Sequence, residues 1–298
     1  KTLPMKVVIL MGGSSEESEV SKATGTAVAL ACKSLGYDVF KLLFQDNYET
    51  LLPKLKNADI VFNALHGGVG ENGKIQTWMN DNRILYTGSG PDASKLCMDK
   101  SRSKALARDL NITTADWELL DNIQEEPTIL LPFVVKPNNQ GSTVGLTIVI
   151  NKNDIKPALN KAFVHGESVI IEKYISGREL TVTVLGDRAY PIVEIQPTHN
   201  LYDYECKYSD GMSKYEVPAK IDSDMTIKIQ QDALKIHESI GCRHYSRVDF
   251  ILDKNNQHHF LEINSLPGMT ETSLLPMAAK EADVDFENLA DIILNMAL

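Results

Sequence analysis

The sequence lacks the features of redox-active, zinc-binding and membrane-spanning proteins. Its four cysteines, Cys32, Cys97, Cys206 and Cys242, are scattered, and none forms a C-x-x-C pair. This usage predicts reduced, mostly buried thiols in a cytoplasmic protein and argues against a zinc site. No apolar run approaches the roughly 18 to 20 residues that cross a bilayer. Residues 1–11 lead directly into an expected strand, so we interpret them as the first structural element rather than a signal peptide.

A surplus of positive charge is also missing. The 298 residues carry a formal net charge of -10, which is not the electrostatic footprint of a nucleic-acid binder. Attraction to an anionic membrane is equally disfavoured. At 43% hydrophobic and 23% charged residues, the composition is that of a globular protein, and the length predicts two or three domains.

The first third of the chain alternates strands and helices. Strands are expected at 6–11, 38–43, 59–65 and 84–86, and helices at 16–35 and 48–56. This alternation predicts a parallel sheet covered by helices. Ligands of such sheets bind at the carboxyl ends of the strands, where both glycine-rich stretches, Gly12-Gly13 and His66 to Gly73, are found.

After residue 90 the pattern becomes α+β. We expect a basic helix at 92–110, a small module of strands at 133–136, 144–150 and 168–172 with a helix at 154–162, and then strands at 179–185 and 189–196, a helix at 223–240, and a terminal helix at 283–296. The predicted organisation is an N-terminal α/β domain at 1–89, a central α+β module at 90–175 and a C-terminal α+β module at 176–298.

Two short motifs near the C-terminal end predict a metal site. Arg247 and Asp249 project from the same face of one expected strand, and Glu262 and Asn264 share a face of the next, because strand residues two apart point the same way. If the strands pair across the turn at 253–256, three oxygen ligands and one guanidinium meet. Oxygen ligands select a hard cation such as Mg²⁺, which enzymes often hold together with substrate phosphates.

Two glycine-containing loops are candidates for nucleotide binding. Residues 139–145, Asn-Gln-Gly-Ser-Thr-Val-Gly, follow the strand that ends at Lys136; G-K-[ST] is absent, but backbone N–H groups of such a hairpin can cover phosphates. Residues 68–73 match G-x-G-x-x-G, which is also found in dinucleotide sites, although the fingerprint belongs in the first strand-to-helix turn. His66, just before it, is equally compatible with substrate contact or with a core position.

Three other segments admit a structural and a functional interpretation. Glu16 and Glu17 open a helix, where carboxylates compensate the helix dipole or hold a substrate ammonium. Glu172-Lys173 ends a strand, where it is either solvated or presents acceptors to an adenine amine and ribose. Residues 202–208, Tyr-Asp-Tyr-Glu-Cys-Lys-Tyr, have no clear period and suit a mobile lid.

Together these segments resemble the D-alanine–D-alanine ligases of the ATP-grasp superfamily, over almost the whole chain. The motifs that carry the resemblance are 12–21, 64–67, 86–90, 98–100, 135–137, 141–145, 202–208 and Glu-Ile-Asn-Ser-Leu-Pro-Gly-Met-Thr at 262–270. The chain departs from the usual pattern at Gln140, at Thr143, at 244–246 and in the short stretch 121–131.

The resemblance implies that ATP lies between the central and C-terminal modules and activates one D-alanine as an acyl phosphate, which the amine of a second D-alanine attacks. The ATP contacts implied are Lys100, Lys136, Ser142, Thr143, Glu172, Lys173, Tyr174, Ile175, Glu179, Lys207 and Asn264. Two Mg²⁺ (or Mn²⁺) ions would be held by Asp249, Glu262 and Asn264.

The resemblance also implies how the amino acids are held. Arg247 and the backbone N–H of Gly268 would stabilise the oxyanion, Glu17 would receive the first ammonium, and Ser142 and Tyr208 would link to Glu17 and close the lid. The remaining substrate contacts implied are Val20, Ser21, His66, Ser273 and Leu274. A Tyr in the lid goes with making the dipeptide rather than D-alanyl-D-lactate.

Three alternatives remain open at this point: another ATP-grasp carboxylate–amine or D-alanine–D-lactate ligase, a nicotinamide-dependent oxidoreductase using the turn at 68–73, and a non-catalytic nucleotide sensor. The resemblance further suggests a homodimer.

Overall fold

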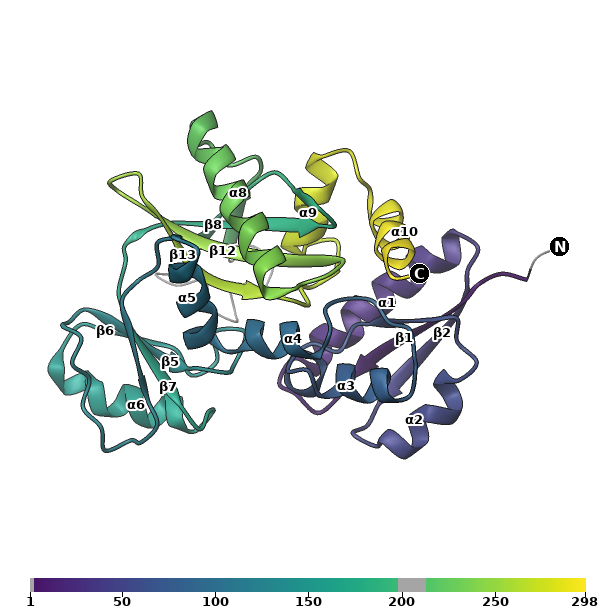
Figure 1. The fold of residues 1–298 in the computed structure, drawn as a ribbon, viewed down its shortest axis with the longest axis horizontal. Helices are drawn as coiled ribbons and strands as arrows, with labels where there is room; N and C mark the ends of the chain where they lie inside the picture. Colours follow the sequence, from purple (N-terminus) through teal and green to yellow (C-terminus); the bar gives the residue numbers. More distant parts are fainter. Residues whose placement is uncertain (1–2, 198–212) are drawn as a thin grey trace.

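The computed structural model describes residues 3–197 and 213–298, which form three sheets (Figure 1). The N-terminal sheet is parallel, in the order β2-β1-β3, with β1 at Lys6–Gly12, β2 at Asp38–Phe44 and β3 at Ile60–Asn63. Helices α1 (Ser18–Ser34), α2 (Tyr48–Leu55) and α3 (Lys74–Asp81) accompany it. The expected strand at 84–86 is wrong: only an isolated bridge joins Tyr86 to Val61, so pairing does not propagate.

The central lobe, as we call residues 117–173, is a four-stranded antiparallel sheet with one covering helix. Its order is β4-β7-β5-β6, with β4 at Trp117–Leu120, β5 at Phe133–Pro137, β6 at Thr147–Val149 and β7 at Val169–Lys173. Helix α6 (Ile155–Phe163) buries Ala158, Leu159 and Ala162 in its core. Strand β4, which pairs with β7, was not expected from the sequence.

The C-terminal lobe is built on a larger antiparallel sheet. Its order is β11-β10-β8-β12-β13, with the short β9 pairing β8. The bounds are β8 Gly177–Leu185, β9 Arg188–Ala189, β10 Val193–Pro197, β11 Ser213–Glu216, β12 Tyr245–Asp253 and β13 His258–Asn264. Helices α8 (Ser223–Ile240), α9 (Leu274–Glu281) and α10 (Phe286–Met296) complete it.

The single basic helix expected at 92–110 is two helices, α4 (Pro91–Met98) and α5 (Lys100–Asp109). Asp99 between them is extended, and its carboxylate accepts a hydrogen bond from Arg102 N at 3.1 Å, so it is the N-cap of α5. The buried faces of both helices pack into the core of the C-terminal sheet rather than into the core of the central lobe. Within the predicted 90–175 module, the first two helices therefore pack with the C-terminal lobe.

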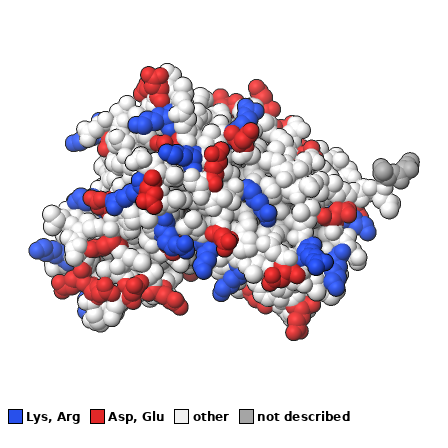
Figure 2. Space-filling model, viewed as in Figure 1, with Lys and Arg blue, Asp and Glu red and all other residues white. Residues whose placement is uncertain are grey.

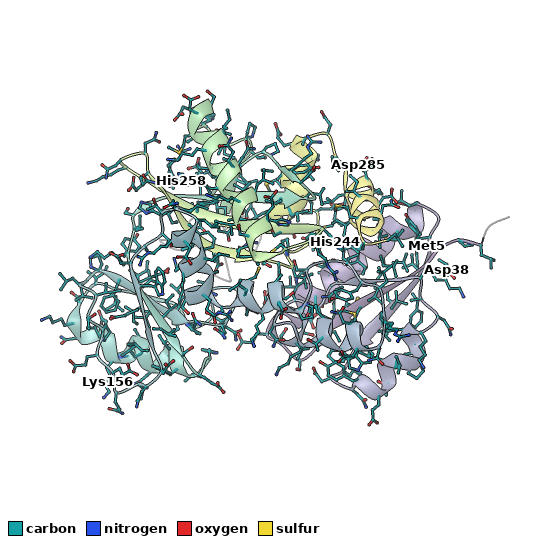
Figure 3. All side chains as sticks on the ribbon, viewed as in Figure 1. Met5, Asp38, Lys156, His244, His258 and Asp285 are labelled. Carbon is teal, nitrogen blue, oxygen red and sulfur yellow. The ribbon has the colours of Figure 1, made fainter. Side chains whose placement is uncertain are left out.

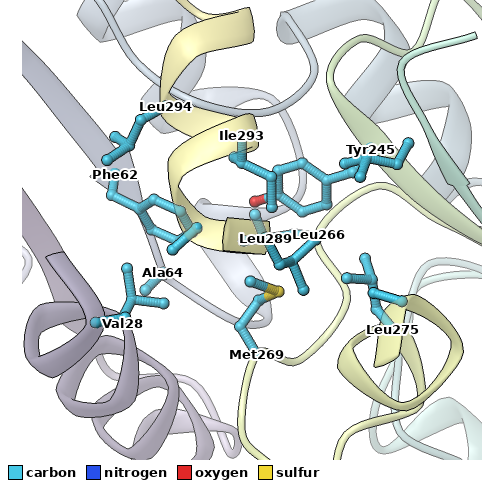
Figure 4. Packing of buried hydrophobic residues seen from close by; sticks show 14 of the residues in the cluster. Val28, Phe62, Ala64, Tyr245, Leu266, Met269, Leu275, Leu289, Ile293 and Leu294 are labelled. Carbon is cyan, nitrogen blue, oxygen red and sulfur yellow. The ribbon is translucent and has the colours of Figure 1, made fainter. Parts of the chain in front are cut away.

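The N-terminal sheet and the C-terminal helices share one hydrophobic core (Figure 4). Phe62 of β3 and Val28 of α1 pack in the same cluster as Leu289 and Ile293 of α10. At the same junction, His244 Nδ1 accepts a hydrogen bond from Gly88 N at 2.9 Å (Figure 3). Apolar packing therefore holds the N-terminal sheet against the C-terminal helices. This packing fixes the position of the N-terminal domain relative to the C-terminal lobe.

The visible face of the surface and the described cysteines do not indicate an additional binding site. On the face shown in Figure 2, acidic and basic side chains are intermixed. Of the cysteines in the described ranges, Cys32 and Cys97 are buried, and Cys97 Sγ lies 3.5 Å from Cys242 Sγ as a thiol contact. Among the described residues, no helix is both long and apolar enough to cross a membrane.

Buried His237 predicts a loss of stability in mild acid. Its Nδ1 lies 2.7 Å from Ser246 Oγ, and burial lowers the pKa of His237 from 6.5 to about 4. Because the fold binds the neutral imidazole, its contribution is complete above pH 6.5 and is lost as the pH falls towards 4. We expect the free energy of unfolding to fall by on the order of 1–2 kcal/mol between pH 7 and pH 5 from this group. Urea titrations of His237→Asn should show a shallower pH dependence than those of the parent protein.

Candidate active site

The predicted pairing of the two motif-bearing strands is confirmed. In the β12–β13 hairpin Arg247 lies opposite Asn264, and Asp249 lies opposite Glu262. A register shift follows Asp249. Alternation along each strand places these four side chains on one face of the sheet. On the other side of β12, β8 brings Thr181 opposite Asp249.

The guanidinium of Arg247 forms a bidentate ion pair with Asp249. Arg247 Nε lies 3.0 Å from Asp249 Oδ1, and Nη2 lies 2.8 Å from Oδ2. Thr181 donates to the same Oδ1 at 2.6 Å. The Glu262 carboxylate lies 3.4 Å from Lys100 Nζ. Each acidic side chain is thus neutralised by a protein cation, and a bound metal ion would compete with these cations for the carboxylate oxygens.

A cavity lies between the central and C-terminal lobes, with about 980 Å³ of empty space including its open mouth. The central sheet supplies one wall and strands β12 and β13 supply the other. Of the residues expected to contact ATP, it is lined by Lys100, Lys136, Thr143, Glu172, Lys173, Tyr174, Ile175 and Glu179, and by the acidic pair Asp249 and Glu262. The apolar part of the lining comprises Val134, Leu146, Ile148, Ile251, Phe260 and Leu261. A mixed lining of this kind can take a flat aromatic base at one end and an anionic chain at the other.

A buried network of alternating charges forms the floor of this cavity. Glu172 Oε1 accepts from Lys136 Nζ at 2.6 Å, and Oε2 lies 3.0 Å from Lys104 Nζ. Burial alone would raise the pKa of Glu172, but the two ammonium groups outweigh it and hold this pKa at about 2. Glu172 is therefore a carboxylate at all relevant pH values. Its Oε2 is buried, and its contact with Lys104 keeps it inside this network.

The loop expected to cover phosphates joins the two cavities of the site. Ser142 and Thr143 have φ of 52° and 64°, a left-handed conformation that is strained for L-residues and for β-branched Thr above all. Lys100 Nζ donates to Gln140 O at 2.6 Å, and Ser142 Oγ donates to Glu17 Oε1. The loop therefore connects the cation on the cavity floor to the carboxylate at the start of α1.

A second, smaller cavity adjoins the first where the N-terminal domain meets the hairpin. The expected site residues that line it are Glu17, Val20, His66, Lys100, Ser142, Arg247, Glu262, Asn264 and Gly268. His66 is also held structurally: Nδ1 lies 3.0 Å from Leu266 O and Nε2 lies 2.9 Å from Thr24 Oγ1. Lys100 and Glu262 line both cavities, whereas Ser142 and Arg247 line the second one alone.

Several expected contacts lie away from these cavities or outside the described residues. Ser21 is buried, and its hydroxyl accepts from Gly12 N and donates to Ala64 O, which ties β1 to the segment after β3. Ser273 is the N-cap position of α9, and Leu274 packs in the shared core. Lys207 and Tyr208, with the lid expected at 202–208, fall outside the described residues.

The glycine-rich turn at 68–73 has a packing explanation. Gly68–Gly70 forms a short 3₁₀ turn, and a Cβ on Gly70 would lie 1.8 Å from the carbonyl oxygen of Leu65. Any side chain at position 70 would collide with this backbone, so packing explains the glycine. The glycine does not indicate a dinucleotide site.

Two site residues were missed by the sequence reasoning, Lys104 and Glu71. Lys104 follows Lys100 by four positions, so both occupy one face of α5, and that spacing was the available signal. Glu71 sits inside the glycine-rich turn, lines the second cavity and lies 3.6 Å from His66 Nδ1. Burial raises the pKa of Glu71 despite the opposing effect of His66.

The donor set at the hairpin fits a hard divalent cation. Asp249, Glu262 and Asn264 offer only oxygen ligands, and they lie beside the cavity whose floor carries the lysines. No cluster of three or more His, Cys, Asp or Glu suited to a metal occurs in the described ranges. Because the protein supplies only two carboxylates and one amide, a cation here would complete its shell with phosphate oxygens and water.

The comparisons with known proteins agree with this geometry. Residues 105–295 match the family model described as D-ala D-ala ligase C-terminus. The D-alanine–D-alanine ligase of Halalkalibacterium halodurans is 39% identical over 304 residues, covering 99% of each chain. The chain belongs to the D-alanine–D-alanine ligase family. The ATP-grasp architecture of this family accounts for the cavity between two α+β lobes.

Solved ligase structures extend the likeness to the whole fold. The D-alanine–D-alanine ligase of Bacillus anthracis, solved in complex with ATP, superposes with a TM-score of 0.88 at 31% identity and covers 99% of this chain and 97% of its own. The VanG D-Ala:D-Ser ligase of Enterococcus faecalis reaches a TM-score of 0.86 at 26% identity, with 99% and 100% covered. Members of this ligase family therefore differ in their second substrate on one shared fold.

Proposed function

We propose that this protein joins two D-alanines to D-alanyl-D-alanine with ATP as the energy source, releasing ADP and phosphate for peptidoglycan precursor synthesis. The observation that carries the proposal is the direct junction of two cavities, one suited to a nucleotide and one to small amino acids, at Lys100 and Glu262, which line both. Phosphoryl transfer from ATP to a substrate in the second cavity requires such a junction.

ATP is proposed to lie with its base between the apolar side chains and its phosphates over the lysines. Glu172, which lines the cavity, suits the adenine amine as an acceptor, and Glu179 suits the ribose. Lys100 and Lys136 neutralise phosphate charge. Two Mg²⁺ or Mn²⁺ ions held by Asp249, Glu262 and Asn264 would supply charge neutralisation and orientation of the phosphates.

The first D-alanine is proposed to bind in the second cavity with its ammonium on Glu17. Its carboxylate oxygen attacks the γ-phosphorus, the bond to the β-phosphate oxygen breaks, and ADP leaves behind an acyl phosphate. The nitrogen of the second D-alanine, in its neutral form, then attacks the carbonyl carbon. Arg247 and Gly268 N–H hold the resulting oxyanion until phosphate departs with its electron pair and the nitrogen loses a proton.

Lid closure and binding of the second substrate complete the site. We infer that Tyr208 joins the hydrogen-bonded pair of Ser142 and Glu17 as the lid closes, and that Ser273 and Leu274, at the N-terminus of α9, receive the second carboxylate. We also infer a cytoplasmic homodimer with three parts, bounded near residues 89 and 175.

The experiment that tests the function is ADP release in the presence of ATP, Mg²⁺ and one amino acid or hydroxy acid. We expect release with D-alanine, none with L-alanine, and D-alanyl-D-alanine as the product in equal amount to ADP. Product formed only when D-lactate or D-serine is added with D-alanine would instead assign a ligase of different second substrate.

Gly67 provides a test of the Glu17 assignment. It has φ of 70° and ψ of 171°, and a Cβ there would lie 2.8 Å from Glu17 Oε2. We expect Gly67→Ala to raise KM for D-alanine by about tenfold or more, with KM for ATP unchanged, because the methyl group displaces the carboxylate. Gly36→Ala is the matched control: its φ is 88°, but nothing lies within 4 Å of the added methyl. Equal KM values for the two variants would argue against Glu17 as the ammonium site.

A further inference from the structure

Lys104 is a fully buried cation with no part in the reaction as described. It has 0% of its surface exposed and is among the largest completely buried side chains. Burying an ammonium group is costly unless it is paired and hydrogen-bonded. It also lines the nucleotide cavity beside Lys100 and Lys136. A buried charge at this position is therefore expected either to serve ligand binding or to hold the two lobes together.

The contacts of Lys104 join both lobes of the cavity. Its Nζ donates to Thr114 Oγ1 at 2.9 Å and to the carbonyl of Phe260 in β13 at 3.4 Å, and it pairs with Glu172 Oε2 in β7 at 3.0 Å. Thr114 Oγ1 donates in turn to Phe260 O at 2.6 Å. Helix α5, which carries Lys104, runs beside β13 (Figure 1). One ammonium group therefore contacts both β13 of the C-terminal sheet and β7 of the central sheet, and it joins the two sheets at the floor of the cavity.

The carboxylate that binds Lys104 also binds a neighbouring lysine, Lys136. The Glu172 carboxylate is divided between Lys104 on one oxygen and Lys136 on the other. Without Lys104, Oε2 would lose its only ionic partner in the described structure, and both oxygens would turn to Lys136. The Lys136 ammonium would then be neutralised by the protein instead of being offered to phosphate.

We propose that Lys104 is a positioning residue for the nucleotide: through Glu172 it sets the orientation of Lys136, and through Thr114 and Phe260 it sets the spacing of the two lobes. This inference rests on the proposed function, because it requires that the cavity binds ATP. It assigns Lys104 no contact with the reacting atoms. Its effect is therefore confined to nucleotide affinity, and the part that acts on Lys136 is transmitted through Glu172.

The test measures ATP binding directly by calorimetry with a non-hydrolysable ATP analogue, together with steady-state kinetics. We expect Lys104→Met to weaken analogue binding and to raise KM for ATP by about 10-fold to 100-fold, with kcat within about threefold and KM for D-alanine within about twofold. Arg102→Met is the matched control, since it removes an exposed cation from the same helix and should leave all four values unchanged.

A double-mutant cycle with Glu172→Gln separates positioning from general loosening of the fold. If Lys104 acts through Glu172, the double variant binds the analogue no more weakly than the weaker single variant. Additive losses, or equal losses for ATP and D-alanine, would overturn the proposal. An unchanged analogue affinity in Lys104→Met would overturn it as well, while failure of the parent protein to bind the analogue would instead refute the proposed function.

Thr114→Val keeps the test decisive if Lys104→Met does not fold. This nearly isosteric change retains the Lys104 charge but removes the hydroxyl that holds it and that bridges to Phe260. We expect a smaller loss of analogue affinity, about threefold to tenfold, with D-alanine kinetics unchanged. Unchanged analogue affinity in a folded Thr114→Val, as judged by its urea midpoint, would count against the proposal.

Discussion

Replacing Arg247 by methionine is expected to lower kcat by about 10²-fold to 10³-fold while KM for ATP changes by less than about threefold. The reason is the position of the guanidinium, on the wall shared by the hairpin and the amino-acid cavity. There it can stabilise charge that develops on the carbonyl oxygen only in the second half-reaction, so its loss affects the transition state more than the bound substrates.

The ion pair between Arg247 and Asp249 leads to a second expected result for the same variant, which concerns its Mg²⁺ requirement. Because Arg247 holds both oxygens of Asp249, its removal frees a carboxylate that is proposed to bind metal. The Mg²⁺ concentration for half-maximal activity should therefore fall or stay constant, not rise. Arg188→Met, which removes an exposed cation from the same sheet, serves as the control and should be kinetically silent. A loss confined to KM for ATP would contradict the oxyanion assignment.

Glu262→Gln is expected to have the largest effect of any single change, on the order of 10³-fold in kcat. The amide keeps the shape of the side chain but removes the charge that faces Asp249 across the hairpin and Lys100 on the cavity floor. Binding of Mn²⁺ in the presence of ATP, followed by electron paramagnetic resonance, should weaken in parallel. This second readout separates loss of metal from loss of chemistry.

The control for this change is Glu281→Gln at the end of α9, where the side chain is exposed. It removes the same charge far from the hairpin, and we expect parental kcat and Mn²⁺ affinity. Parental Mn²⁺ affinity in Glu262→Gln would show that Glu262 is not a metal ligand, whatever happens to the rate.

Local patterns in the sequence predicted the parts of the site that lie on regular strands. The period of two along β12 and β13 placed Arg247, Asp249, Glu262 and Asn264 on one face, and the observed register agrees. The parallel N-terminal sheet followed from the alternation of apolar runs with amphipathic helices. Both predictions need only the periodicity of side chains within short segments of the chain.

Contacts between elements far apart in the sequence could not be predicted in this way. The break between α4 and α5 depends on the Asp99 cap competing with a continuous helical pattern. The pairing of Lys104 with Glu172 joins positions in different lobes, and Lys104 appeared in the sequence only as one of several basic residues on a helix. The bidentate hold of Arg247 on Asp249 depends on side-chain rotamers that no pattern encodes.

The central claim is that a substrate carboxylate takes the γ-phosphoryl group before the peptide bond forms. Its most direct test uses D-alanine labelled with ¹⁸O in both carboxylate oxygens, with ATP and Mg²⁺, and mass spectrometry of the released phosphate. The mechanism predicts one ¹⁸O atom in each phosphate released, because the oxygen that attacks phosphorus leaves with it. Unlabelled phosphate would mean that the γ-phosphoryl group passes to water instead, and would contradict the account.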